Sequence, residues 1–182
     1  RAQYQAKSLR TQAPFDGRID WDKVGTARGS WFVKDTNGYR GKGDQTASFD
    51  NHGKVAHGYW DTHLALAPDA VDNAAFIYSI GDFDGCPCQF MAKNNLDPAT
   101  VTPSATPTVV ELVEFSFVTP AGAPVSPANP QKGYLLKAGT NVAGLLAFQL
   151  NQDGSMTVEK MPGATSAAAF TGFTSKAQTY VR

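Results

Sequence analysis

Three histidines are candidate metal ligands, because His52, His57 and His63 lie close together in the sequence. Asp50 and Asp61 lie beside them, and imidazole and carboxylate groups are ligands that zinc and copper take in proteins. The spacing of the histidines matches no established ligand motif. The alternative is a polar loop that ends with one histidine at the start of a strand, and the sequence leaves this choice open.

Two cysteines form a second reactive pair, because only Pro87 separates Cys86 from Cys88. A disulfide across so short a span is strained, since bridged cysteines prefer Cα atoms roughly 5.5–6 Å apart. The spacing also differs from the C-x-x-C of thioredoxin-like proteins, and two thiols alone make a poor structural zinc site. The redox state of this pair therefore stays open.

Sequence motifs for catalysis are absent from the chain. It lacks the G-x-S-x-G nucleophile elbow, a phosphate loop between a strand and a helix, and the full calcium loop of an EF-hand. We therefore expect neither a cofactor nor catalysis. A metal-dependent enzyme at the region of His52, His57 and His63 is the alternative.

Aromatic residues offer a further kind of site. Inside a barrel of about eight strands they either fill the interior or line a pocket for one small ligand. Packing of the interior is the default, because protein cores are normally filled. Whether the interior is open stays undecided, and for a pocket the candidate ligand-binding residues are Arg28, Trp31, Trp60, His63 and Tyr78.

Strands must position these residues, because apolar and polar residues alternate along much of the chain, which is the period of a β-strand. The clearest hairpin joins 142–150 to 155–161 through the turn 151-NQDG-154, where glycine tolerates a positive φ. The other strand-like runs are 24–33, 62–68, 74–80, 88–92, 109–118 and 176–182.

These strands predict an all-β fold, an antiparallel barrel of eight to ten strands. A barrel is favoured because the run 176–182 lacks the proline or clustered charge that protects an exposed edge, and pairing with an early strand removes that edge. We expect residues 1–14 to form a short N-terminal arm or helix and residues 15–182 to form a single barrel domain.

Composition and charge exclude two classes of protein. The 182 residues suit one domain, and their 16 basic and 16 acidic side chains give a formal net charge of zero. Nucleic-acid binding needs a clustered positive field and is not expected. A membrane span is not expected either, because no apolar stretch approaches the about 20 residues that a spanning helix requires.

The short sequence 29-GSW-31 resembles the G-x-W signature of the lipocalin (calycin) superfamily. That resemblance implies that Trp31 lies under the floor of a barrel and that a basic residue of the last strand, here Arg182, crosses its ring. A fuller pattern resembles uncharacterised secreted bacterial proteins and implies a lipocalin-like β-barrel without a known activity. It includes 25-GTARGSWF-32, 63-HLALAPDAVD-72, 78-YSIGDF-83, 89-QFMAKNNLDPATV-101, 110-VELVEF-115 and 170-FTGFTSKAQTYVR-182.

The expected function is that of a binding module for a small, largely apolar ligand. The chain begins at Arg1 rather than Met and only 18% of its residues are charged, so we expect a secreted or periplasmic protein whose leader was removed or trimmed. The alternative from another class is a structural or interaction subunit of an extracellular assembly. In that case the N-terminal arm 1–14 would mediate self-association.

Overall fold

The computed structural model describes residues 6–15, 20–36 and 62–182 of the chain. Within these residues the fold is all-β, as predicted. Its elements are β1 (Gly29–Val33), β2 (His63–Pro68), β3 (Phe76–Phe83), β4 (Cys86–Ala92), η2 (Pro98–Thr100), β5 (Thr108–Val118), β6 (Pro124–Val125), β7 (Leu135–Leu150), β8 (Met156–Pro162), η3 (Ala167–Ala169) and β9 (Gln178–Val181).

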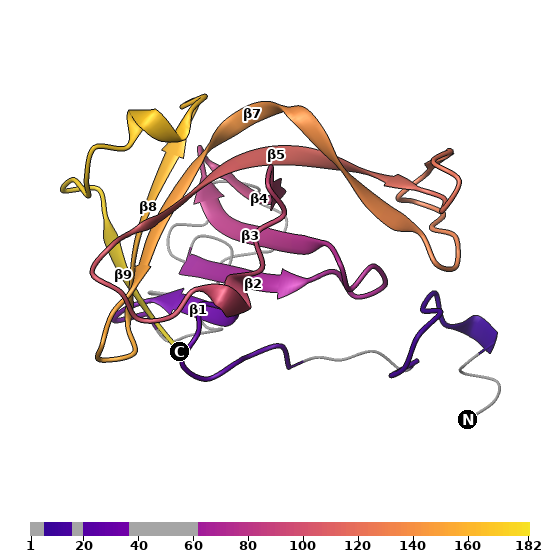
Figure 1. Cartoon of the computed structure of the whole chain (residues 1–182), viewed down its shortest axis with the longest axis horizontal. Coiled ribbons are helices and arrows are strands. Elements are labelled where there is room, and N and C mark those ends of the chain that lie inside the picture. The colour runs from indigo at the N-terminus through magenta and orange to yellow at the C-terminus, as the bar shows by residue number, and fades with distance from the viewer. Residues whose placement is uncertain (1–5, 16–19, 37–61) are drawn as a thin grey trace, which may run out of the picture.

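Eight of the described strands close into an antiparallel barrel, with β6 outside it (Figure 1). The sheet runs in the order β4-β3-β2-β1-β9-β8-β7-β5-β6, and an additional pairing of β4 with β5 closes the ring. The late strand β9 pairs with the early strand β1, where Val33 lies opposite Tyr180. This pairing confirms the prediction that the last strand removes its own exposed edge by joining an early one.

The barrel interior is apolar because alternate residues of each strand point inward. Trp31 on β1 lies opposite Leu64 on β2, and Leu64 lies opposite Ile80 on β3. Buried side chains from all eight barrel strands then form one continuous cluster: Ala27, Trp31, Leu64, Leu66, Tyr78, Ile80, Phe83, Phe90, Ala92, Val110, Leu112, Leu146, Phe148, Leu150, Met156, Val158 and Tyr180. We call this set the interior cluster.

The segment between β4 and β5 covers one end of the barrel, which we call the closed end. Leu96 and Val101 from this segment pack against the interior cluster. Val101 also accepts a backbone hydrogen bond from Ala27, at 2.9 Å. Within the segment, the side chain of Asp97 caps the short helix η2 by accepting from the backbone of Ala99. Backbone and side-chain contacts together fix the cover in place.

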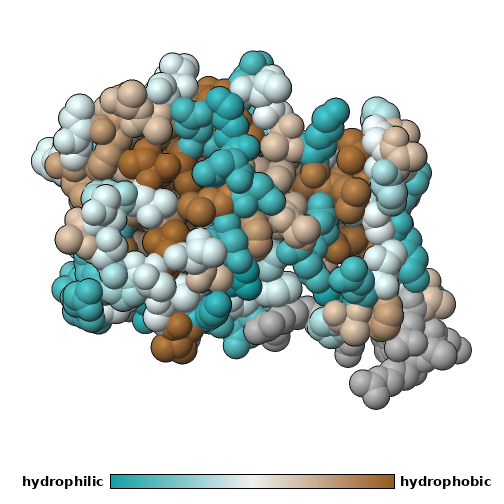
Figure 2. Space-filling model, in the orientation of Figure 1, coloured by the Kyte–Doolittle hydropathy of each residue, from teal (hydrophilic) through white to brown (hydrophobic). Residues whose placement is uncertain are grey.

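The hairpin of β5 and β7 continues beyond the barrel and builds a second, smaller core (Figure 1). Here β6 pairs with the end of β5, and Leu9 from the N-terminal residues packs against the same group. The buried members of this group are Ala75, Met91, Val113, Tyr134 and Leu136. Figure 2 shows apolar side chains gathered in two areas of one face, one over the barrel and one over the extended hairpin, with a hydrophilic band between them.

The predicted hairpin of 142–150 and 155–161 is present as β7 and β8, joined by the turn in which Gly154 has a φ of 82°. β7 begins at Leu135, earlier than predicted, because the turn-like residues Gly139, Thr140 and Asn141 lie inside it. The pairing with β5 shifts register between Leu112 and Phe115, and the extra residues of this irregular stretch bulge out of β7.

Candidate functional site

Trp31 lies at the base of the interior, where only 1% of its surface is exposed. Its indole Nε1 donates to the backbone carbonyl of Ala27 at 2.8 Å. The guanidinium of Arg182 lies 4.0 Å from the centroid of the Trp31 ring. A cation at this distance interacts favourably with the π face of an indole. The contact implied by the G-x-W resemblance is therefore present in the structure.

Arg28 lies at the closed end and is held by two interactions. Its guanidinium donates to both carboxylate oxygens of Asp97, at 2.6 and 2.7 Å. The same guanidinium lies 5.4 Å from the centroid of the Phe76 ring. Because Asp97 belongs to the covering segment, this ion pair fastens the cover to the residue that precedes β1.

Two tyrosines point their hydroxyl groups into the barrel, and within the described part of the chain only one of these hydroxyls has a hydrogen-bond partner. Tyr78 donates to the backbone carbonyl of Leu96 at 3.0 Å. The hydroxyl of Tyr180 has no hydrogen-bond partner among the described residues, although its side chain is fully buried. Burial raises the pKa of Tyr78 well above its ordinary value, and burial also raises the pKa of Tyr180. Both phenols are therefore neutral hydrogen-bond donors at physiological pH.

His63 lies on the outer face of the barrel, because its neighbour Leu64 points inward. Its Nε2 lies 3.1 Å from the hydroxyl of Ser79 on β3. A serine–histidine contact also occurs in nucleophilic catalysis, but here only 4% of the histidine surface is exposed, which leaves a substrate little access. The contact is a cross-strand hydrogen bond that satisfies a buried imidazole.

The structure brings together three of the residues predicted to bind a ligand. Arg28, Trp31 and Tyr78 lie toward the closed end, whereas His63 begins β2 and faces outward. Trp60 lies outside the described residues. The role of these five residues in ligand binding stays a prediction.

Within the described residues no group of three or more histidine, cysteine, aspartate or glutamate side chains could hold a metal ion. His52 and His57 lie outside that part of the chain, so the predicted histidine cluster is not tested. No helix in the described part has the length and apolar character needed to cross a membrane.

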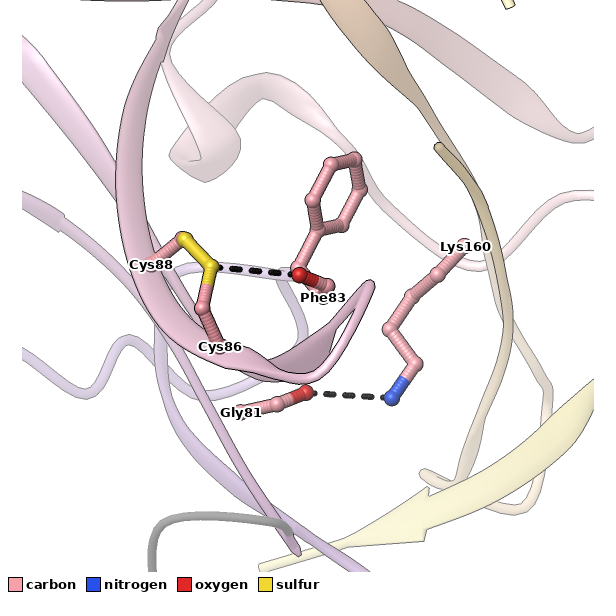
Figure 3. The surroundings of a disulfide bond; sticks show 5 residues. All are labelled: Gly81, Phe83, Cys86, Cys88 and Lys160. Carbon is pink, nitrogen blue, oxygen red and sulfur yellow. Dashed lines mark hydrogen bonds between the residues drawn. A yellow bond between two sulfur atoms is a disulfide. The ribbon is translucent and has the colours of Figure 1, made fainter. Parts of the chain in front are cut away.

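The end opposite the closed end carries a polar group that sequence reasoning missed. Lys160 shares the inward face of β8 with Met156 and Val158. Its ammonium donates at 3.0 Å to the backbone carbonyl of Gly81 on β3 (Figure 3). Three strands separate β3 from β8 in either direction around the ring, so the side chain spans the interior. The sequence signal that could have revealed this inward lysine is its alternation with Met156 and Val158, which places all three side chains on one face of a strand.

Phe83 crosses the interior beside Lys160 and packs onto β7. A Cβ atom at Gly144 would lie 2.6 Å from the tip of the Phe83 ring, so only glycine permits this approach. The β3–β4 hairpin at this end also contains a disulfide between Cys86 and Cys88 (Figure 3). We call this the hairpin end of the barrel.

Among the described residues the apolar interior thus contains the hydroxyl groups of Tyr78 and Tyr180 and the ammonium of Lys160. Such an arrangement is suited to binding a molecule that is apolar over most of its surface. No protein-family model, curated protein or solved structure matches this chain.

Proposed function

We propose that this protein is a β-barrel binding module for a small, largely apolar ligand and that it acts without catalysis. The closed barrel supports the proposal, since interiors of this size hold one small ligand or are filled by side chains. The ligand would enter at the hairpin end, because the segment with Leu96 and Val101 covers the other end.

The Tyr180 hydroxyl is the observation that carries this proposal. A buried hydroxyl without a partner costs about 1–3 kcal/mol, so proteins rarely retain one. Phenylalanine would fill the same space in an apolar core without that cost. A ligand with an acceptor oxygen would satisfy the hydroxyl, which gives the tyrosine a reason to be there.

In this proposal Lys160 controls the entry of the ligand into the interior. Its side chain spans the interior at the hairpin end, and a bound molecule would have to displace its contact with Gly81. A lysine can do so at low cost, because its long flexible stem lets the ammonium move out to water. The ligand would then lie between Phe83 and Tyr180.

The disulfide supports a secreted or periplasmic location for the protein. Disulfides form and persist in oxidising compartments and are rare in the reducing cytosol. The alternative of self-association through residues 1–14 receives less support. Of that arm, Leu9 packs against the second core of the same chain and Arg10 is buried there.

Saturable binding of a neutral apolar dye, N-phenyl-1-naphthylamine, tests the proposal. Ligands of equal chain length with a ketone, an alcohol or no oxygen are then used as competitors. We expect one dye per chain, and the ketone should compete better than the alkane. Tyr180→Phe should weaken the ketone about tenfold and leave the alkane unchanged, because only the oxygen meets the hydroxyl.

Tyr78→Phe is the matched control, because the Tyr78 hydroxyl is already bonded to Leu96. It should leave the preference for the ketone unchanged. Native mass spectrometry of the purified protein adds a search for a molecule that copurifies with it. The proposal fails if neither the dye nor any competitor binds saturably and the mass is that of the chain alone.

A further inference from the structure

We propose that the Cys86–Cys88 disulfide is a redox-active site that exchanges with external thiols and is not a cross-link that stabilises the fold. The proposal does not rest on ligand binding in the barrel interior. The proposal rests on where the bridge lies in the fold, on its access to solvent and on the groups around it (Figure 3).

The bridge joins no two elements of the fold. Both cysteines belong to β4, two positions apart, and β4 is already held by backbone pairing to β3 and to β5. A disulfide stabilises a protein mainly by closing a loop in the unfolded chain, and the benefit shrinks with the loop. A bridge that spans a single residue, Pro87, therefore contributes little to stability.

The bridge also disturbs the strand that carries it. Residues two apart in a regular strand have Cα atoms about 6.6–6.8 Å apart, whereas Cys86 and Cys88 are 5.4 Å apart. Beside the bridge the pairing of β3 with β4 shifts register, because β3 carries one extra residue between Ile80 and Phe83. Reduction would release β4 to a more extended form. The Cα separation is within the ordinary range for a disulfide, so the distortion lies in β4.

The bridge lies partly at the surface, although Cys88 also packs against the interior cluster. Cys86 and Cys88 are both partly exposed, and Pro87 between them is exposed. The pair lies next to the tight turn of the hairpin, where Asp84 and Gly85 have positive φ values of 55° and 79°. Disulfide exchange requires in-line access to one sulfur, and the proposal requires this partly exposed hairpin end to allow it.

The surroundings favour the reduced form. The Sγ atom of Cys86 lies 3.1 Å from the carbonyl oxygen of Phe83 (Figure 3). A disulfide sulfur has no hydrogen to donate, so this contact becomes an S–H···O hydrogen bond only when Cys86 is a thiol. Lys160 places its ammonium at Gly81 on the other strand of the same hairpin (Figure 3), and the proposal includes that this positive charge favours a thiolate.

The exchange conserves atoms and electrons. A thiolate attacks one sulfur of the bridge, the S–S bond breaks, and the other cysteine leaves as a thiolate that takes a proton from water. A second thiol then attacks the mixed disulfide and releases the oxidised partner. Overall, two thiols become one disulfide while Cys86 and Cys88 become two thiols, so two electrons and two protons pass to the protein.

Reduction by glutathione, followed by thiol alkylation and mass measurement, tests the proposal. We expect the folded protein to be reduced at a rate within about tenfold of the rate in denaturing guanidinium. We also expect the variant with both Cys86→Ser and Cys88→Ser to unfold within about 4 °C of the parent. A bridge that reacts only after unfolding, or a much larger loss of thermal stability, would overturn the proposal.

Lys160 variants test the role assigned to the positive charge. Lys160→Met should slow the reduction of the folded protein several-fold, and Lys160→Arg should restore the rate because it restores the charge. A purely structural role for Lys160 would change thermal stability without changing the rate of thiol attack. An unchanged rate in Lys160→Met would overturn the electrostatic assignment.

Discussion

The guanidinium of Arg182 lies over the indole ring of Trp31, 4.0 Å from the ring centroid, and thereby joins the end of β9 to β1. The same guanidinium donates to the backbone carbonyls of Thr26, at 2.9 Å, and of Arg28. One cation therefore covers the indole and satisfies two carbonyls that precede β1. This contact closes the barrel where its first and last strands meet.

Replacing Arg182 should destabilise the barrel more than its exposed position suggests. Arg182→Met keeps much of the packing but removes the charge and the donors, and we expect a loss of about 1–3 kcal/mol. Arg182→Lys keeps the charge but lacks the planar fork, so it should recover only part of the loss. Denaturant unfolding followed by tryptophan fluorescence measures both. Full recovery by lysine would show that charge alone accounts for the contact.

The two interior tyrosines should respond in opposite directions when their hydroxyl groups are removed. In ligand-free protein, Tyr180→Phe removes a buried hydroxyl that has no partner among the described residues, and it should stabilise the fold by about 1 kcal/mol. Tyr78→Phe leaves the carbonyl of Leu96 without its partner and should cost about 1–2 kcal/mol. Equal effects of the two substitutions in denaturant unfolding would contradict the difference seen between these hydroxyls.

Much of the barrel could be predicted because its determinants are local. Alternation of side chains locates the strands, and Asn151 to Gly154 mark a turn wherever the chain folds. The extension of β7 could not be predicted, because Gly139, Thr140 and Asn141 are turn formers by themselves. They lie in a strand because β5 pairs with β7 on both sides of them.

The candidate site was harder to predict than the fold. The Trp31–Arg182 contact followed from a short signature and a residue in the last strand. The inward direction of Lys160 could be inferred only after the register of β8 was known, and its acceptor Gly81 lies on the opposite wall. That the Tyr180 hydroxyl has no partner in the described part of the chain could not be read from the sequence, because it depends on every group that surrounds the hydroxyl.

Stability should fall steeply in alkali. Burial, followed by the negative charge of Asp69, raises the pKa of Tyr134 from 10.0 to about 12. The unfolded chain loses its tyrosine protons near pH 10, before the folded chain does, so stability is full below pH 10 and declines between about pH 10 and 12. Tyr78 and Tyr180, whose pKa values are also raised, act in the same direction.

Tyrosinate absorbance and circular dichroism recorded over the same pH range measure this effect. Ionisation of the buried tyrosines should coincide with unfolding. Tyr134→Phe should make the loss of stability with rising pH less steep, because it removes one of the groups that bind their protons more tightly in the folded state. Tyrosine ionisation that is complete while the β-sheet signal is unchanged would contradict the prediction.

Asp97 should contribute to stability in two separable ways. It accepts from the backbone of Ala99 as a helix cap, at 2.8 Å, and it pairs with Arg28. Asp97→Asn keeps an oxygen for the cap and removes the charge, so we expect a loss of about 0.5–1 kcal/mol for this partly exposed pair. Asp97→Ala removes both and should cost about 1–3 kcal/mol. A double-mutant cycle that combines Asp97→Ala with Arg28→Ala should show coupling between the two residues. When the cycle starts instead from the Asp97→Asn variant, Arg28→Ala should no longer show this coupling, because the charge is gone.

Arg10 should control whether the N-terminal residues stay docked on the second core. Only 4% of its surface is exposed, and its guanidinium donates to the backbone carbonyl of Ala70 between β2 and β3. The adjacent Leu9 accepts from the backbone of Gly133 at 2.7 Å. Arg10→Ala leaves the Ala70 carbonyl without this donor, at a local cost of about 1–3 kcal/mol.

Hydrogen exchange in Arg10→Ala should therefore accelerate at Gly133 and around Leu136. The barrel strands should keep their protection, because the two cores are distinct. Leu9→Ala serves as the matched control, since it removes apolar contact but keeps the guanidinium. Uniform acceleration throughout the barrel would instead mean that the docked residues and the barrel unfold as one unit.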